Sequence, residues 1–313
     1  MLKFGRNYKL VFKIGKSSLR SVNGDEISEI EWTEEIVVSY PLTLRFTVTR
    51  SPYSTMNNGF FQIMNLNKNT FSKLYRDIYD TTKIIRLDFY AGYGDNLPLV
   101  FSGEVWECNT WKEGKGTEFL TEISCLTGLS TYNFLYSSRT YATGTKPLDI
   151  IKDLCKDAGL KLKGYSQEII NDIKPLEKET SFNGLSIDCL RDFVNYKDSE
   201  IDNVVIDNGE VYIAGKNDVR DYGAIILDAD AGLLGYPRRR DYTMDVELLF
   251  EPRLVQKQLI RLVSKVDEFF NGVYEVVGFS HSGVISGAVG GQCKTTATLY
   301  VGGQSFNFVT KNE

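Results

Sequence analysis

Residues 91–105 read AGYGDNLPLVFSGEV, and this stretch decides between two fold classes for the chain. Closely spaced glycines beside an acid are typical of nucleotide-binding loops, but Leu97 stands where a dinucleotide motif needs its third glycine. A phosphate-binding loop also leads into a helix, whose first backbone amides hold the phosphate. Here Pro98 leads instead into the strand-like alternation of residues 99–105. The stretch therefore predicts a turn between two strands, and no cofactor is expected.

Apolar and polar residues alternate through the first third of the chain, as they do in half-buried strands. In residues 42–49, two leucines, a phenylalanine and a valine share one face, while threonines and an arginine share the other. The same period of two recurs in residues 8–14, 85–89 and 119–125. Several antiparallel strands of this kind predict a barrel or a sandwich.

Turn and helix signals lie between these strands. Turns are predicted at the Asn-Gly pairs of residues 23–24 and 58–59. One helix is expected over residues 70–79, where apolar side chains share a face, with Asn67 or Asn69 as its N-cap.

The middle of the chain has a different pattern. After the polar stretch SSRTYATGT, helices are expected over residues 147–158 and 184–196, followed by a hairpin that turns at residues 208–209. This predicts a small α/β piece. From about residue 224 the strand alternation returns, first in residues 244–250, so the fold class is predicted to be β-rich α+β.

The composition limits the possible functions. The chain has 36 Lys and Arg against 41 Asp and Glu, so its net charge of −5 provides no global basic field for nucleic acid or an anionic membrane. The N-terminal segment MLKFGRNYKLVFKIG interrupts each apolar run with a basic residue, so we expect a strand rather than a signal peptide. Five scattered cysteines without a C-x-x-C pair are predicted to be buried thiols in a reducing compartment.

Two local motifs suggest chemistry or binding. The sequence GFSHSG around His281, the only histidine, resembles a hydrolase motif, but Ser282 replaces its final glycine, so we expect a structural histidine. Arg238, Arg239 and Arg240 form a basic cluster in an acidic chain, and we predict that they face acidic surface on another subunit.

Two tryptophans, Trp106 and Trp111, precede the turn-prone sequence KEGKG of residues 112–116. We expect Trp106 to be an ordinary structural aromatic residue, whereas Trp111 is either that or an anchor at an interface. No pair of carboxylates stands out as an acid and a base, and no catalytic, cofactor-binding or metal-binding set is expected. The absence of a readable active site favours a structural or binding role.

Two segments resemble a known family. The first is LRFTVTRSPYSTMNNGFFQIMNLNKNTFSKLYRDIY, followed by IRLDFYAGYGDNLPLVFSGEV. The second is ILDADAGLLGYPRRRDYTMDVELLFEPRLVQKQLIRLVSK, with NGVYEVVGFSHSG downstream. In order and spacing they resemble the baseplate hub proteins of contractile-tailed phages and related injection systems, including the late control protein D group. His281-Ser282-Gly283 lacks the aspartate that often follows in that family.

The resemblance implies an architecture of two tail-tube-like antiparallel β-barrel domains with a small α/β domain between them. The first barrel, with one helix, would occupy residues 1–132, the α/β domain residues 133–228, and the second barrel portion residues 229–313. Three such chains would form a homotrimer that imitates the six-fold end of the tail tube and adapts it to a three-fold central spike.

The resemblance also implies partners and a location. The expected partners are the chain itself, the tail tube protein and the central spike protein, together with the tape measure protein and baseplate wedge proteins. DNA would pass only in transit through an acidic channel, without membrane insertion and without enzymatic activity. The protein would lie in the tail baseplate of the virion after assembly in the host bacterial cytoplasm.

Three alternatives stay open at this point. One is a peptidoglycan hydrolase of the tail tip, and another is a β protein that binds the host surface. The third is a distal tail protein, which would form hexamers rather than trimers.

Overall fold

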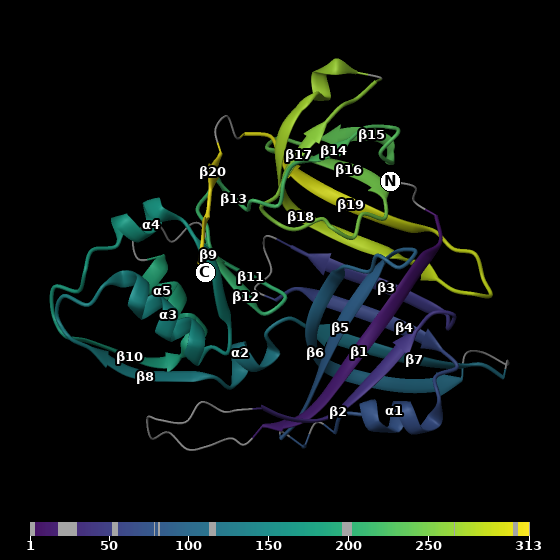
Figure 1. Ribbon diagram of the computed structural model, residues 1–313, viewed down its shortest axis with the longest axis horizontal. Coiled ribbons are helices and arrows are strands. Elements are labelled where there is room, and N and C mark those ends of the chain that lie inside the picture. Colours follow the sequence, from purple (N-terminus) through teal and green to yellow (C-terminus); the bar gives the residue numbers. More distant parts are fainter. Residues whose placement is uncertain are drawn as a thin grey trace. The chain divides into compact units, whose positions relative to one another are not determined.

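A computed structural model describes residues 4–17, 30–51, 56–77, 79–80, 82–112, 117–195, 202–265, 267–302 and 306–312. The chain divides into two compact units (Figure 1). The first unit takes in Met1–Ser17, Ile30–Leu126 and Tyr222–Gly303, and the second takes in Thr127–Asp221 and Gln304–Glu313. Each unit has hydrophobic clusters of its own.

The first unit is built on one large sheet, in the order β15-β16-β19-β18-β3-β4-β7-β6-β5-β1-β2. Two more strands lie off this path: β17 pairs with β18, and β14 pairs with β17. The strands are β1 (Arg6–Ser17), β2 (Ile30–Ser39), β3 (Leu44–Arg50), β4 (Asn58–Met64), β5 (Lys83–Tyr93), β6 (Leu99–Lys112), β7 (Phe119–Leu126), β14 (Ile225–Leu227), β15 (Leu233–Arg239), β16 (Thr243–Leu249), β17 (Leu259–Leu262), β18 (Gly272–Ile285) and β19 (Cys293–Tyr300). Two short helices accompany them, α1 (Lys68–Leu74) and the 3-10 helix η1 (Glu268–Phe270).

One strand pair joins the two ends of the chain. Strand β18 pairs antiparallel with β3, from Phe279 opposite Arg50 to Ile285 opposite Leu44. On its other side β18 pairs with β19. The first and last thirds of the sequence therefore belong to one hydrogen-bonded sheet.

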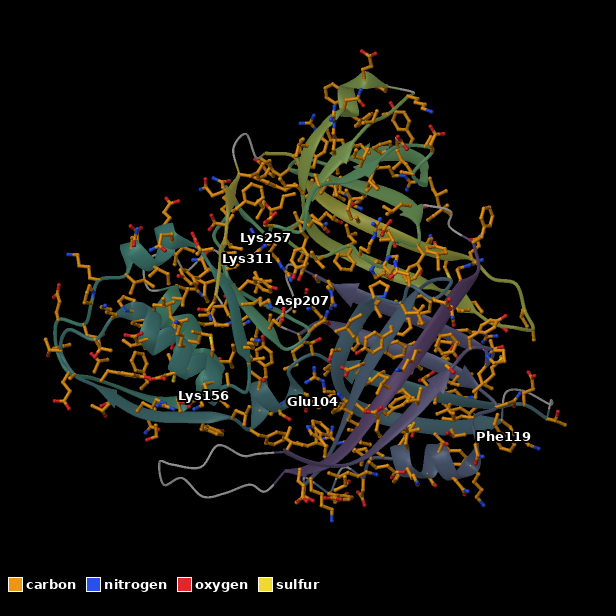
Figure 2. All side chains as sticks on the ribbon, viewed as in Figure 1. Glu104, Phe119, Lys156, Asp207, Lys257 and Lys311 are labelled. Carbon is orange, nitrogen blue, oxygen red and sulfur yellow. The ribbon has the colours of Figure 1, made fainter. Side chains whose placement is uncertain are left out.

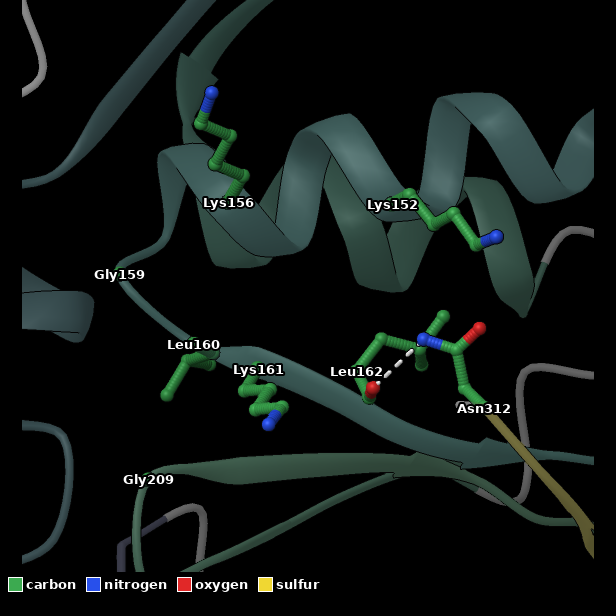
Figure 3. Close-up of a pocket in the computed structure, with 8 residues that line it drawn as sticks. All are labelled: Lys152, Lys156, Gly159, Leu160, Lys161, Leu162, Gly209 and Asn312. Atoms are coloured by element: carbon green, nitrogen blue, oxygen red, sulfur yellow. Dashed lines mark hydrogen bonds between the residues drawn. The ribbon is translucent and has the colours of Figure 1, made fainter.

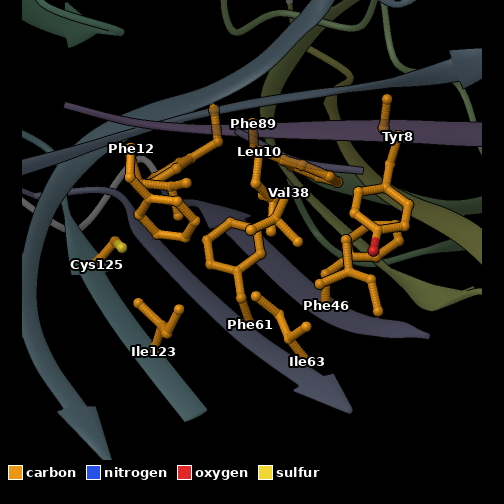
Figure 4. Close-up of a cluster of buried hydrophobic side chains, with 14 of the residues drawn as sticks. Tyr8, Leu10, Phe12, Val38, Phe46, Phe61, Ile63, Phe89, Ile123 and Cys125 are labelled. Carbon is orange, nitrogen blue, oxygen red and sulfur yellow. The ribbon is translucent and has the colours of Figure 1, made fainter. Parts of the chain in front are cut away.

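Apolar residues that alternate with polar residues in the sequence are the buried residues of the sheet. In β3, which begins at Leu44 rather than at the predicted residue 42, Leu44, Phe46 and Val48 are buried. The ring of Phe89 lies between those of Phe46 and Phe61, with centroid distances of 5.0 and 5.1 Å (Figure 4). Burying one such side chain contributes about 1.5–3 kcal/mol, so these rings are a major source of stability for this half of the sheet.

The predicted turn between residues 91 and 105 is confirmed, because β5 ends at Tyr93 and β6 begins at Leu99. Gly94 has φ +60°, a backbone conformation that favours glycine. Gly92 lies inside β5, and a Cβ atom there would be 2.1 Å from the carbonyl oxygen of Asn96. One glycine therefore forms the turn, and the other permits the close approach of the returning chain.

The predicted turn at residues 58–59 is wrong, because β4 begins there. Glycine is needed at position 59 for packing, since a Cβ atom would lie 2.8 Å from the ring of Phe101. The other predicted Asn-Gly turn, at residues 23–24, lies outside the described residues.

Helix α1 is shorter than predicted. Asn67 is its N-cap, and its side chain accepts a hydrogen bond from the backbone N–H of Asn69. The helix ends at Leu74. The ammonium group of Lys83 donates to the carbonyl oxygens of Lys73 and Tyr75, at 2.8 and 2.7 Å. These bonds satisfy carbonyl groups that a longer helix would have used.

The second unit is the expected small α/β piece. It contains the two predicted helices, now α3 and α5, and the predicted hairpin. Asn208 and Gly209 both have positive φ values, +53° and +82°, as a two-residue hairpin turn requires. Its elements are α2 (Leu129–Asn133), β8 (Tyr136–Tyr141), α3 (Pro147–Asp157), β9 (Lys161–Tyr165), α4 (Gln167–Asp172), β10 (Thr180–Leu185), α5 (Ser186–Val194), β11 (Val204–Asp207), β12 (Glu210–Ile213), β13 (Asp218–Val219), β20 (Asn307–Phe308) and β21 (Thr310–Lys311).

The C-terminal strands complete this second unit. Its main sheet has the order β11-β12-β9-β21, and β20 pairs with β13. The apolar faces of α3 and α5 supply Ile151, Leu154, Ile187 and Leu190 to the core. The last strand thus closes a sheet whose other members lie about a hundred or more residues earlier.

The predicted β-rich α+β class is confirmed by these elements. Among the described strands the large sheet does not close into a barrel, since β15 and β2 remain its two ends. The two-barrel arrangement and its boundaries at residues 132 and 228 therefore stay predictions.

A buried ion pair lies in the second unit. The guanidinium Nη1 of Arg220 is 2.9 Å from Oδ2 of Asp207, which is labelled in Figure 2, and both side chains are almost fully buried. The same guanidinium group lies 3.8 Å from the centre of the Tyr212 ring. Removing one member of such a pair leaves the other charge buried without its counterion.

We expect Arg220→Ala to lower the free energy of unfolding by about 3–5 kcal/mol, because the Asp207 carboxylate would lose its buried counterion. Urea unfolding followed by circular dichroism measures the change. The matched control is Lys265→Ala, which removes the exposed ion pair with Asp230 and should leave the unfolding curve unchanged. Equal effects of the two substitutions would contradict the prediction.

His281 is buried in the first unit, where β18 joins the two halves of the sheet. Its ring lies between those of Phe250 and Phe279, with centroid distances of 5.3 and 4.8 Å. Nδ1 is 2.7 Å from the hydroxyl oxygen of Thr295. Burial, and secondly the positive charge of Arg50, lower the pKa of His281 to about 3, so the imidazole is neutral at pH 7.

This lowered pKa predicts an acid sensitivity. The unfolded chain binds a proton at pH about 6.5, whereas the folded chain does so only near pH 3. The folded state should therefore keep its full stability above pH 6.5 and lose about 1.4 kcal/mol per pH unit below it from this group.

The variant His281→Gln should lack this component of the pH dependence. The difference in unfolding free energy between wild type and variant should be constant at pH 7–8 and should shrink steadily between about pH 6.5 and 4, in urea titrations at each pH. Parallel curves over that whole interval would show that His281 is not buried in its neutral form.

Candidate interaction surfaces

The described residues contain no group of three or more His, Cys, Asp or Glu side chains that could hold a metal ion. Burial raises the pKa of the Cys108 thiol to about 11 and that of Cys155 to about 12, so these thiols stay protonated. All five cysteines are free, and Cys189 alone is half-buried rather than buried. No described helix is long and apolar enough to cross a bilayer.

The predicted arginine cluster lies at the end of β15, an edge strand of the large sheet. Arg238, Arg239 and Arg240 are all exposed. Nε of Arg240 is 2.9 Å from Oδ2 of Asp245, and Arg238 lies opposite Asp245 in the strand register. Arg240 is thus partly neutralised within its own chain.

Arg239 belongs to an exposed aromatic cluster. Its guanidinium group lies 5.3 Å from the centre of the Phe269 ring, which is 65% exposed. The ring of Phe270 contacts those of Phe269 and Tyr236 edge to face, at 5.4 and 5.1 Å. The hydroxyl of Tyr236 donates to Asp267 at 2.8 Å. Exposed arginine and tyrosine side chains held in place in this way are the residue types that carry binding energy at protein interfaces.

Both tryptophans of β6 are exposed. Trp111 is 42% exposed and lies opposite Leu120 of β7. Trp106 is 53% exposed, so it is not a buried core residue, and its expected ordinary role stays a prediction. A bulge between Val105 and Glu107 makes Trp106 an extra residue in the strand, and sequence alternation does not reveal it.

The structure does not bring the predicted interface residues together. Trp111 lies on β6 and the arginines on β15, and the strands β16, β19, β18, β3, β4 and β7 separate them. They occupy two separate edges of an eight-strand run.

The face of this run that points away from the hydrophobic core is mostly polar, with Phe60, Leu234 and Leu249 as exposed apolar residues. Alternation and register place Thr47, Thr49, Ser280, Ser282 and Thr296 on it, in neighbouring strands. Its charged residues are the carboxylates Glu104, Glu107, Glu122, Asp245 and Glu247 and the cations Arg45, Arg238 and Lys294, together with Arg240, which pairs with Asp245. Five carboxylates stand against four cations, so the face has a slight negative balance.

The second unit contains two hollows that no sequence motif indicated. The larger, of about 840 Å³, lies beside α4 and α5 and is partly lined by Ile169, Ile173, Leu176, Phe182 and Phe193. The smaller, of about 490 Å³, lies between α3 and the start of β9 (Figure 3). Three lysines line it, Lys152, Lys156 and Lys161.

Comparison with known proteins agrees with a structural role. The chain matches the baseplate hub gp41 family over residues 27–282. No curated protein sequence matches it.

Solved structures with the same fold include a 43 kDa tail protein of prophage MuSo2 from Shewanella oneidensis. It shares 9% identity, with a TM-score of 0.55 and coverage of 93% of this chain and 96% of that one. The tail protein from Neisseria meningitidis MC58 also shares 9% identity, with a TM-score of 0.54 and coverage of 96% and 97%.

A third similar structure is the E. coli c3393 protein, a component of the type VI secretion system with structural similarity to T4 bacteriophage tail proteins gp27 and gp5. It shares 11% identity, with a TM-score of 0.53 and coverage of 86% of this chain and 76% of that one. Because the family match spans most of the sequence, the chain belongs to the baseplate hub gp41 family and is a structural component of a phage tail.

Proposed function

We propose that this protein is a trimeric baseplate hub that adapts the six-fold tail tube to a three-fold central spike and lets the genome pass. The observation that carries the proposal is the single sheet that joins the first and last thirds of the chain through β3 and β18. A chain that presents two similar β halves gives a trimer six such halves, which suits a six-fold tube on one side and a three-fold spike on the other.

The cores of the first unit support two halves per chain. One buried cluster is formed mainly by residues of β1 to β7, and a second by residues of β14 to β19. Phe250, Ile285 and Cys293 extend from the last third into the first cluster. We propose that the two tail-tube-like domains lie within residues 1–132 and 229–313, with the α/β domain of residues 133–228 between them. Strands β20 and β21 are exceptions that belong with the α/β domain, and β14 belongs with the large sheet.

The two edges of the eight-strand run favour a ring of chains in which each edge pairs with an edge of the neighbouring chain. From β15 to β6, eight strands follow one another, and each pairs antiparallel with its neighbour. Among the described strands, β15 has a neighbour on one side only, and residues 107–112 of β6 pair only with β7. Because the eight strands alternate in direction, β15 and β6 run in opposite directions. Pairing of β15 of one copy with β6 of the next copy would therefore be antiparallel, like every other pair in the run.

The side chains at the two edges are complementary. Arg238 lies opposite Asp245, and Glu107 lies opposite Ser124, which places both on the sheet face that points away from the core. The exposed rings of Trp106, Trp111 and Tyr236 flank these charges. In this arrangement Arg238 of one copy meets Glu107 and Trp111 of the next, while Arg239 lies at the same edge on the other face of the sheet. This is the interface role predicted for these residues.

The polar face of the sheet suits the wall of a channel. Its carboxylates outnumber its cations, so it would repel DNA phosphates rather than retain them. The tail tube protein and the central spike protein would bind the two rims of the trimer, and the tape measure and wedge proteins are further proposed partners. This role is assembly rather than catalysis, within a contractile baseplate assembled in the host cytoplasm.

Native mass spectrometry of the purified protein tests the copy number. We expect three chains per particle. Six chains would favour a distal tail protein, and a chain that stays monomeric at all concentrations would contradict self-assembly of the hub.

Charge reversal tests the edges. Arg238→Glu and Glu107→Arg should each weaken the trimer about tenfold or more, because like charges would meet across the interface. The two changes combined in one chain should restore it. Glu122→Arg is the matched control, since Glu122 lies on the same face in an inner strand and should leave the trimer intact. If the double variant forms a trimer no more stable than that of either single variant, the proposed edge contact is wrong. The proposal of a trimeric hub would not be affected by that result.

A further inference from the structure

The smaller hollow of the second unit is lined by basic residues without an acidic one. The lining consists of Lys152, Lys156, Gly159, Leu160, Lys161, Leu162, Gly209 and Asn312 (Figure 3). Lys152 and Lys156 lie one turn apart on α3, and Lys161 begins β9. All three lysines are exposed. The hollow is therefore a local positive site on a chain whose net charge is −5.

Two of the three acidic residues of helix α3 are held by a basic partner. Asp153 and Asp157 face Arg139 of β8, whose guanidinium nitrogens lie 3.7 and 2.6 Å from their carboxylates. Lys152 and Lys156 line the hollow, and the exposed Asp149 lies one turn before Lys152. Among the described residues, no carboxylate lies within ion-pairing distance of Lys152, Lys156 or Lys161, in contrast to Lys163 nearby, which is 3.8 Å from Glu210. The three ammonium groups are available to an outside anion.

Three backbone amides around the hollow are already engaged. The amides of Gly159, Leu160 and Lys161 donate to carbonyl oxygens at 3.0, 2.9 and 3.2 Å. The side-chain amide of Asn312 donates to the carbonyl oxygen of Leu162 at 3.0 Å. A bound anion would meet only lysine ammonium groups, which are mobile and strongly hydrated point charges.

These features distinguish between classes of anion. A single phosphate is usually held by several fixed backbone amides, which are absent from this lining. Single-stranded nucleic acid needs aromatic rings for its bases, and the lining has none. Duplex DNA needs a wider basic surface than three lysines. An acidic segment of a protein, with several carboxylates on a flexible chain, fits ammonium groups spread over an open hollow.

We infer that the hollow formed by Lys152, Lys156 and Lys161 docks an acidic segment of a partner protein. The net charge of the chain repels an acidic partner from most of its surface, so a local basic site determines where such a partner binds. This surface belongs to the second unit and is separate from the sheet edges proposed for self-assembly.

Fluorescence anisotropy with a labelled hexaglutamate peptide and the full-length protein tests this inference. We expect binding at low ionic strength that weakens as salt is added. The triple variant Lys152→Glu, Lys156→Glu and Lys161→Glu should weaken peptide binding at least about tenfold. The corresponding triple glutamine variant, which removes the three charges without reversing them, should also weaken binding. The matched control replaces Lys174, Lys178 and Lys216, three exposed lysines of the same unit, with glutamate. This variant should bind the peptide like wild type.

Three results would overturn the inference. The first is no peptide binding by wild type at low salt, and the second is an equal loss in the control variant, which would show a general charge effect. The third is tighter binding of a short DNA duplex or of tripolyphosphate that depends on the same three lysines, which would identify a phosphate-binding surface. Unchanged thermal unfolding of both triple variants would establish that they remain folded.

Discussion

The antiparallel pairing of β18 with β3 is the interaction on which the first unit depends. It joins residues far apart in the chain, as the contact between the hydroxyls of Thr49 and Ser280 illustrates across 231 positions. Closing so long a connection has an entropic cost, which the backbone hydrogen bonds and the packed rings behind the strands must exceed. Without this pairing, each half of the sheet would expose another unpaired strand edge.

Buried polar groups lie where the two halves meet. The guanidinium group of Arg50 donates to the carbonyl oxygen of Val100 at 2.8 Å and lies near the rings of Phe101 and Phe279. His281 and Thr295 bond to each other in the same region. A shift of one residue in β18 would move His281 to the opposite face of the sheet and break that bond, so these groups favour a single register.

The two units offer different chemistry for assembly. The first carries an arginine and aromatic edge at β15, a tryptophan edge at β6 and a polar face between them. The second carries a basic hollow on an otherwise acidic chain. Both kinds of surface consist of side chains that self-association or a partner would cover in the proposed assembly. This fits a protein of the baseplate hub gp41 family.

Local sequence patterns determined part of the fold. Alternation indicated the strands β1, β3, β5, β7 and β16, and turn and capping residues indicated the hairpins at Gly94 and Asn208-Gly209. These features depend on neighbours within a few residues, which sequence periodicity records directly. The order of the motifs also pointed to the baseplate hub family.

Only the tertiary structure decided which strands pair and which side chains meet. The pairing of β18 with β3, the need for glycine at position 59 beside Phe101 and the exposure of Trp106 at a bulge all depend on strands that approach from elsewhere in the chain. The lysine hollow likewise joins a helix to a strand. Periodicity shows which face of an element is apolar, but it does not show which partner covers that face, because the partner is selected by packing over the whole unit.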